Sequence, residues 1–236
     1  MTNVTPDLVE SIFSTPIVYY KYPDDKHKEL KEAVRVAIQK VEPGYAEHTN
    51  SLVHFYQHNK EHLLYDNDDP IFQDFHDWLE DCYAHTVQKV QGWRIGEKAF
   101  ITDCWVNITR DGGNQVMHNH ANSFLSGTYY LQMPEGAGAI QFFNPSSMPN
   151  KPNFGFDNRI ATPFNQAQYY GNCQEQYLLV WPSNIVHQTL PTTGDGVRTS
   201  ISMNFLPKEF IAGAYNFKII KHDFDDPDEY PRSTQL

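Results

Sequence analysis

The chain has 236 residues, of which 40% are hydrophobic and 14% aromatic, so it has the apolar side chains for a sizeable core, and disorder throughout is excluded. Its 18 basic and 29 acidic residues give a formal charge of -11, which repels phosphate backbones and anionic membranes; we expect neither nucleic acid nor a membrane as partner. The length suits a single domain over residues 1–236.

The cysteines and the N-terminus indicate the compartment. Cys82, Cys104 and Cys173 are odd in number and form no C-x-x-C pair, which argues against a disulfide framework and against a cysteine zinc site. The N-terminus lacks a charged segment followed by an apolar run, and no stretch approaches the ~20 apolar residues that cross a bilayer. We therefore expect a soluble, cytoplasmic protein.

Two helices are predicted in the N-terminal part, residues 1–97. Apolar residues recur near the helical period over residues 24–41. A stronger pattern covers residues 69–92, where Asp69 is a good N-cap residue and Pro70 suits the first helical position. Its continuous apolar face predicts that this helix packs against a sheet.

From residue 98 the pattern changes to short runs rich in aromatic and β-branched residues, separated by Gly, Pro and Asn. This pattern is typical of an all-β sandwich or barrel, so the expected fold is mainly β, with the helices on the outer face of a core over residues 98–207. The candidate strands are 99–109, 115–120, 126–133, 139–143, 168–170, 177–181, 185–190 and 197–206.

Two segments have no predicted strand or helix. Residues 144–167 contain four prolines and are too long for a tight hairpin, so they are either a lid or disordered. Residues 208–236 form a C-terminal extension with an acidic, proline-containing end, which we expect to be mobile or engaged with a partner.

A pair of histidines stands in the segment N-Q-V-M-H-N-H-A-N. Side chains two apart on a strand share a face, so His118 and His120 can chelate one metal. His187, in W-P-S-N-I-V-H-Q-T, offers a third ligand. Three imidazoles on one face would leave open positions on an octahedral metal, as in non-haem Fe(II) enzymes.

Eleven residues after His187, Arg198 and Ser200 occur in the run G-D-G-V-R-T-S-I-S-M-N-F. On an inward-facing strand they share a face, where a guanidinium and a hydroxyl can grip a carboxylate. A buried arginine requires an anionic partner, and a dicarboxylate would supply one.

The combination of H-x-H, a distal histidine and R-x-S resembles the Fe(II)- and 2-oxoglutarate-dependent oxygenases. The stretch W-V-N-I-T-R-D-G-G-N-Q-V-M-H-N-H-A-N-S-F-L-S-G-T-Y-Y-L is similar to a group of such oxygenases, mostly without an assigned substrate, and the similarity covers roughly residues 100–205. The resemblance implies a jelly-roll core, or double-stranded β-helix, and a dioxygenase that is most simply a hydroxylase.

The resemblance also implies roles for individual residues. It places His118, His120 and His187 on the iron-ligand positions and as the catalytic centre, and Arg198 on the position that grips the far carboxylate of 2-oxoglutarate. The family usually has a carboxylate where His120 stands; in another interpretation His120 is the ligand and His118 lies outside the metal's direct contacts.

Further cosubstrate contacts are expected from Ser200 and Asn107, and from Tyr129 or Tyr130. Adjacent residues on a strand face opposite ways, so only one of the two tyrosines can point inward, and we favour Tyr130.

The implied cofactors are Fe(II), 2-oxoglutarate as cosubstrate, and O2, with ascorbate as a candidate reductant. The implied reaction decarboxylates 2-oxoglutarate to succinate and oxidises a small-molecule or protein substrate that the sequence does not identify. The sequence does not decide between a monomer and a homodimer.

Other interpretations stay open. A cupin-like metal- or sugar-binding protein shares the fold, although the glutamate that cupins place after H-x-H is replaced here by Phe124 and Leu125. A nonenzymatic relative of the fold is a third alternative. His54, His58 and His62 would align on a helix and could bind a metal, but residues 53–56 are as readily a strand.

Overall fold

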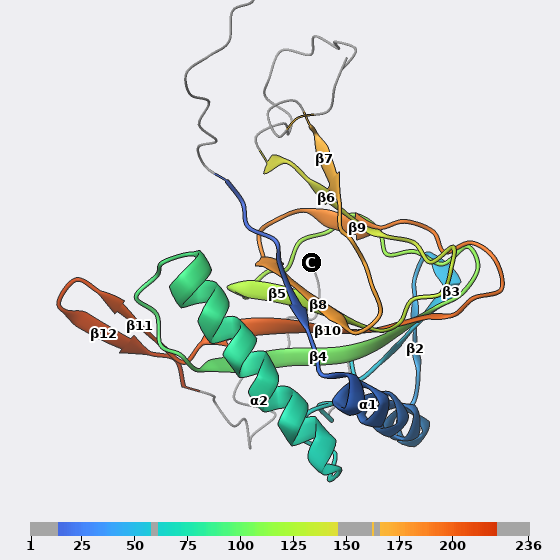
Figure 1. Cartoon of the computed structure of the whole chain (residues 1–236), viewed down its shortest axis with the longest axis horizontal. Helices are drawn as coiled ribbons and strands as arrows, with labels where there is room; N and C mark the ends of the chain where they lie inside the picture. The colour runs from blue at the N-terminus through green and yellow to red at the C-terminus, as the bar shows by residue number, and fades with distance from the viewer. Residues whose placement is uncertain (1–13, 58–60, 146–161, 163–165, 221–236) are drawn as a thin grey trace, which may run out of the picture.

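The computed structural model of the chain describes residues 14–57, 61–145, 162 and 166–220. Its main element is a seven-stranded antiparallel sheet in the order β1-β8-β5-β10-β4-β3-β2 (Figure 1). The strands are β1 (Val18–Lys21), β2 (Gly44–Ala46), β3 (Thr49–Phe55), β4 (Ala99–Thr109), β5 (Leu125–Gln132), β8 (Tyr177–Pro182) and β10 (Arg198–Pro207).

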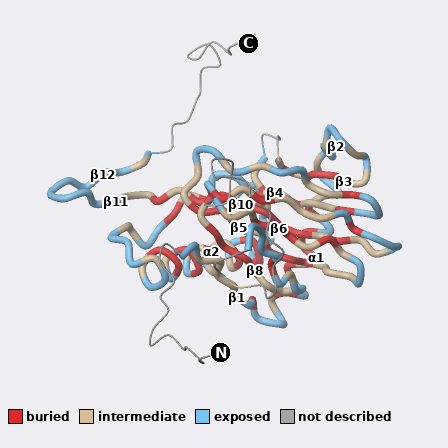
Figure 2. The backbone as a smooth tube through the Cα atoms, turned by 90° about the horizontal axis from the view of Figure 1, so that it is seen from above, coloured by how far each residue is buried: buried red, intermediate tan, exposed pale blue. Residues whose placement is uncertain are grey.

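A smaller sheet has the order β7-β6-β9 and lies across from the large one (Figure 1). It comprises β6 (Ile140–Phe143), β7 (Gln168–Tyr170) and β9 (His187–Thr189). The two facing antiparallel sheets form the jelly roll that the sequence predicted. A hairpin of β11 (Glu209–Ala212) and β12 (Tyr215–Lys218) projects from one end (Figures 1 and 2).

Two helices cover the outer face of the large sheet (Figure 1). They are α1 (Asp24–Ala37), extended by the 3-10 turn η1 (Ile38–Lys40), and α2 (Pro70–His85), extended by the π-helical turn η2 (Thr86–Val90). Asp69 caps α2 as predicted, since its carboxylate accepts a hydrogen bond from the amide of Ile71 at 3.1 Å. Neither helix is long and apolar enough to cross a membrane, and the described residues offer no other candidate.

The main core lies between these helices and the large sheet (Figure 2). Leu30 of α1 and Phe75 of α2 are fully buried there with Met203 of β10. A second, smaller core around Trp181 and Phe142 lies between the two sheets. Each fully buried large side chain contributes about 1.5–3 kcal/mol, so the packing of the helices holds the large sheet in place.

Strand β10 separates the two environments residue by residue. Ile201, Met203 and Phe205 point to the helices, whereas the alternate residues Arg198, Ser200, Ser202 and Asn204 line a pocket on the inner face. The period-two geometry of a strand therefore places four polar side chains in a row between the sheets.

A β-bulge interrupts the pairing of β10 with β4. Asn204 pairs with Asp103, but Phe205 pairs with Ile101, so Thr102 is an extra residue. Before the bulge Ile101 faces the core, and after it Cys104 does. The extra residue thus turns Asp103 toward the inner face, as bulges near functional sites often do.

Several predictions differ from the structure. The N-terminal part supplies β1, β2 and β3 to the large sheet in addition to the helices. Residues 115–120 are not a strand. They form one isolated bridge to β9, His118 to His187, and accept one further backbone hydrogen bond, from the amide of Thr189 to the carbonyl of Gln115. Most of the segment 144–167, and residues 221–236 of the C-terminal extension, lie outside the described residues.

Candidate metal and 2-oxoglutarate site

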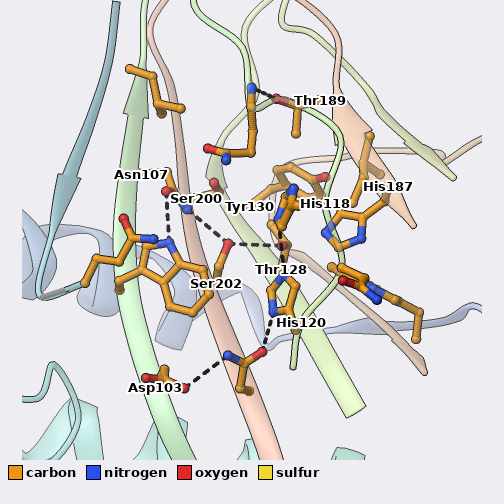
Figure 3. Close-up of a pocket in the computed structure, with 18 of the residues that line it drawn as sticks. Asp103, Asn107, His118, His120, Thr128, Tyr130, His187, Thr189, Ser200 and Ser202 are labelled. Carbon is orange, nitrogen blue, oxygen red and sulfur yellow. Dashed lines mark hydrogen bonds between the residues drawn. The ribbon is translucent and has the colours of Figure 1, made fainter. Parts of the chain in front are cut away.

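A pocket of about 330 Å³ opens between the two sheets (Figure 3). Its floor is the inner face of β3, β4, β10 and β5, and its opposite wall contains β9 and residues 118–121. The volume is within the usual range for small-ligand sites, and hydroxyl and amide groups line it together with histidines.

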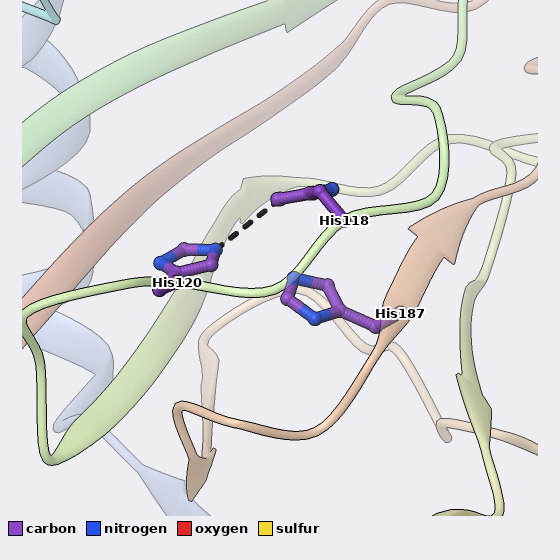
Figure 4. A group of neighbouring side chains, drawn as sticks. All are labelled: His118, His120 and His187. Atoms are coloured by element: carbon purple, nitrogen blue, oxygen red, sulfur yellow. Dashed lines mark hydrogen bonds between the residues drawn. The ribbon is translucent and has the colours of Figure 1, made fainter.

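The structure brings together the three histidines that the sequence singled out (Figure 4). His187 begins β9, and the bridge between His118 and His187 consists of two backbone hydrogen bonds of 2.9 Å. The amide of His120 donates to the carbonyl of Ser183 at 3.0 Å. The potential ligand atoms of the three imidazoles all lie within 4.8 Å of one another.

Hydrogen bonds assign the same tautomer to each ring. The Nδ1 of His118 lies 2.8 Å from the carbonyl of Val116, and the Nδ1 of His187 lies 2.9 Å from the carbonyl of Ile185. The Nδ1 of His120 contacts the side-chain oxygen of Asn204. These oxygens only accept, so each Nδ1 carries the proton and each Nε2 presents a lone pair.

Two of these Nε2 atoms face each other. The Nε2 atoms of His118 and His120 are 3.2 Å apart, and with both Nδ1 atoms protonated this contact joins two acceptors (Figure 4). Burial lowers the pKa of His118 and of His120, and burial followed by the nearby His118 lowers the pKa of His187 to about 3. Protonation is therefore disfavoured, and a metal ion fits this donor set.

Arg198 lies on the floor of the same pocket and is only 3% exposed. Its Nη1 donates to the carbonyl of Gly138 at 2.6 Å, and its Nη2 donates to the hydroxyls of Thr109 at 3.1 Å and Thr189 at 3.4 Å. Its Nε is buried without a hydrogen-bond partner, and none of the ion pairs among the described residues includes it.

A buried guanidinium that lacks an anion is costly, and burial accordingly lowers the pKa of Arg198. The carboxylate of a ligand would offset this cost. The residues present therefore fit 2-oxoglutarate at this end of the pocket.

The two adjacent tyrosines of β5 face opposite ways. Tyr130 lines the pocket beside Ser200, whereas Tyr129 packs under the helices, where its hydroxyl lies 2.7 Å from Nδ1 of His27. Cys173 donates to the Tyr130 hydroxyl at 3.0 Å. Burial raises the pKa of Tyr130 well above its usual range, so the hydroxyl keeps a proton that it can donate to an anion.

Asn107 belongs to a polar network across the pocket floor (Figure 3). Its side-chain oxygen lies 2.8 Å from Nδ1 of His54 and accepts from Nε1 of Trp105 at 3.1 Å. Its amide donates to Ser202 at 3.0 Å, and Ser202 lies 3.1 Å from the hydroxyl of Thr128. These bonds hold the floor rigid between Arg198 and the histidines.

Asn204 and Asp103 were not identified from the sequence. The side-chain oxygen of Asn204 contacts Nδ1 of His120, and its amide donates to Asp103 at 3.1 Å. The second bond fixes the orientation of the amide, because a carboxylate only accepts. The sequence could have indicated Asn204, because alternate residues of a strand share a face. Continuing from Arg198 and Ser200 by two residues at a time leads to Ser202 and Asn204.

The other histidines are arranged differently from a helical metal site. His54 belongs to strand β3, and His62 bonds to the carbonyl of Ile101 at 3.1 Å, while His58 lies outside the described residues. His85 is exposed on α2. His76, Asp77 and Glu80 also come close on α2, but Lys208 already pairs with Glu80.

Residues 103–204 match a family model described as "Putative 2OG-Fe(II) oxygenase". The core of this chain is therefore similar to that family. The matched segment begins at Asp103 and ends at Asn204, so it contains the histidines and the arginine of the site. No curated protein matches the chain.

Several solved structures share the fold of this chain. HygX from Streptomyces hygroscopicus, solved with nickel, 2-oxoglutarate and hygromycin B, is 10% identical with a TM-score of 0.55, over 82% of this chain and 83% of HygX. The carbocyclase SnoK from nogalamycin biosynthesis, called non-heme and alpha ketoglutarate dependent, is 9% identical with a TM-score of 0.60, over 83% and 81%.

A prolyl-4-hydroxylase from Pseudomonas putida is 12% identical with a TM-score of 0.53, over 81% of this chain and 92% of that one. At these identities the likeness concerns the fold of the oxygenase core. Together with the family match, it supports an oxidoreductase and does not favour the cupin-like alternative.

Proposed function

We propose that the chain is a 2-oxoglutarate- and Fe(II)-dependent dioxygenase that hydroxylates a small-molecule or protein substrate. The observation that carries the proposal is one pocket holding two complementary, incomplete sites. Three unprotonated Nε2 atoms converge in it. In the same pocket a buried guanidinium lacks an anion among the described residues.

His118, His120 and His187 would hold the iron, and this ligand set contains no carboxylate. Three neutral ligands leave the full charge of the ion to attract a dianionic cosubstrate. The backbone bridge between His118 and His187 fixes two of the rings relative to one another, and Asn204 fixes the third. Such outer contacts orient ligands and raise their basicity.

Arg198 would bind the far carboxylate of 2-oxoglutarate, with Ser200 and Tyr130 as further donors. Asn107 would act mainly by holding the pocket floor, because its side chain already bonds to protein groups. These contacts orient the cosubstrate with its keto acid toward the histidines. They also exclude water from the buried end of the pocket, where Arg198 and Ser200 are each 3% exposed.

Iron and 2-oxoglutarate, when bound with O2, supply the oxidising chemistry: 2-oxoglutarate loses carbon dioxide to become succinate, and the substrate gains oxygen. The protein's contribution is position, charge and exclusion of water. We further propose a cytoplasmic location, which the free thiols of Cys82, Cys104 and Cys173 support.

Succinate release from 2-oxoglutarate under air, with added Fe(II) and ascorbate, tests the proposal. Wild-type protein should release succinate slowly without substrate, and His187→Ala should release none. His85→Ala is the matched control, because His85 is exposed on the far side of the large sheet. If wild type neither releases succinate nor binds 2-oxoglutarate in calorimetry with Ni(II), the proposal is wrong.

A further inference from the structure

We propose that the substrate of this pocket carries a cationic nitrogen, an amine or a guanidine, which Asp103 binds at the open end. The inference rests on the proposed function and names the substrate class of the same site.

Among the described residues that line the pocket, Asp103 and Arg198 are the formally charged ones, apart from histidines. They lie at opposite ends, because Arg198 pairs with Thr109 and Asn204 pairs with Asp103, six residues further along β10. At ~3.3 Å per residue this separation is about 20 Å. Arg198 is buried and Asp103 is exposed.

This polarity assigns the two ends to different ligands. An anionic cosubstrate is attracted to Arg198 and repelled by Asp103. The other end, which opens to solvent, is left for the molecule that is oxidised. A carboxylate there favours a cation and disfavours a second anion.

The carboxylate of Asp103 is only partly engaged. Its Oδ2 accepts from the amide of Asn204 and from the hydroxyl of Thr102, each at 3.1 Å. The hydrogen bonds found for Asp103 among the described residues all use Oδ2, and none of the ion pairs there includes Asp103. Oδ1 can therefore accept from a ligand, in a charge-assisted hydrogen bond if the donor is an ammonium.

Trp105 adds a second element of recognition. It follows Asp103 by two residues on the same face of β4, and it also lines the pocket. Its Nε1 is bonded to Asn107, which fixes the indole, and its ring centroid lies 6.0 Å from that of His120. A fixed, partly exposed indole beside a carboxylate suits a cation, because the ring face attracts positive charge.

The position is close enough to the proposed metal to matter for the reaction. Asp103 and His120 contact the two ends of one amide, that of Asn204. A nitrogen held by Asp103 would therefore place carbon atoms a few bonds away near the histidines. The formal charge of -11 would also raise the local concentration of cations.

The rival explanation is that Asp103 serves only to orient Asn204. Asp103→Asn separates the two roles, because the new side chain can still accept from Asn204 while its charge is gone. Asp25→Asn is the matched control: it removes one exposed carboxylate on α1, on the other side of the sheet.

The experiment measures binding to the full chain loaded with Ni(II) and 2-oxoglutarate, by calorimetry. The probes are matched pairs: 1,4-diaminobutane with 1,4-butanediol, and butylguanidine with butylurea. In wild type the cation of at least one pair should bind roughly tenfold or more tightly than its neutral partner. In Asp103→Asn that ratio should fall to near one, and in Asp25→Asn it should persist.

The ratio cancels any uniform loss of binding in the variant, so a disturbed Asn204 does not imitate the result. If no cation binds more tightly than its neutral partner in wild type, or if the preference survives in Asp103→Asn, the inference is overturned. Nickel and 2-oxoglutarate binding are titrated first. Their failure would count against the proposed function, whereas their success without a cation preference would count against this inference alone.

Discussion

The two faces of β10 come from one continuous run of sequence, but one face packs in the apolar core and the other lines the polar pocket. Toward the helices, Ile201, Met203 and Phe205 are fully buried among apolar groups. Toward the small sheet, Arg198 and Asn204 are also buried, but among polar groups, and the guanidinium retains an unpaired Nε. Depth of burial alone therefore does not distinguish a core from a binding site, whereas unsatisfied hydrogen-bonding groups do.

The largest effect should come from the apolar face. Phe205→Ala removes a ring that is 0% exposed and that stacks on Tyr83 with centroids 5.9 Å apart. We expect the free energy of unfolding to fall by about 3–5 kcal/mol. Urea titration measures this loss. Below the transition, 2-oxoglutarate affinity should stay within about twofold of wild type, and a much larger change would mean that the two faces are coupled.

The counterpart on the polar face is Arg198→Met, which keeps most of the side-chain volume but removes the charge. The 2-oxoglutarate dissociation constant should rise by about 30-fold or more, since losing one partner of a buried ion pair costs roughly 2–5 kcal/mol. Calorimetry with Ni(II) measures it. Nickel affinity without 2-oxoglutarate should be nearly unchanged; an equal loss of nickel would show that Arg198 supports the histidines instead.

Asn204→Leu tests the contact that orients His120. Without the acceptor for Nδ1, the ring loses its preferred tautomer, and we expect nickel affinity to fall by about 10–100-fold. Met203→Leu, one residue away on the other face, is the control and should leave nickel affinity unchanged. Equal nickel affinities in wild type and Asn204→Leu would show that Asn204 does not contribute to metal binding.

The smallest effect is expected at the adjacent tyrosines. Tyr130→Phe removes a donor in the pocket and should weaken 2-oxoglutarate binding by about 2–10-fold, as one hydrogen bond is worth about 0.5–1.5 kcal/mol. Tyr129→Phe breaks the bond to His27 and should lower the free energy of unfolding by about 1 kcal/mol with no change in 2-oxoglutarate binding. If Tyr129→Phe weakened 2-oxoglutarate binding and Tyr130→Phe did not, the placement of Tyr130 in the pocket and of Tyr129 under the helices would be contradicted.

Much of the site could be predicted because strands obey a simple period. The boundaries of β4 and β7 match the sequence pattern, and R-x-S on an inward-facing strand correctly placed Arg198 and Ser200 in one pocket. The histidine pair was found for a partly wrong reason. His118 and His120 converge through a loop with one bridge to β9, and not through strand alternation.

The missed features depend on contacts between distant segments. Strands β1 and β2 are four and three residues long, too short for their pattern to exceed the background, and they form by pairing with β8 and β3. Trp105 packs against the main core and also lines the pocket. Its face depends on the bulge, which is a property of how β4 pairs with β10.

The extra residue Thr102 also changes which positions of β4 face the core. Odd-numbered residues face the core up to Ile101, and even-numbered residues do so from Cys104 onward. The strand therefore contains two segments whose core-facing positions alternate in opposite phase, and the one extra residue, Thr102, joins them. Deleting Thr102 would leave a single phase, so either Cys104 and Val106 would leave the core or Ala99 and Ile101 would. One residue thus lets one strand serve stability at one end and chemistry at the other.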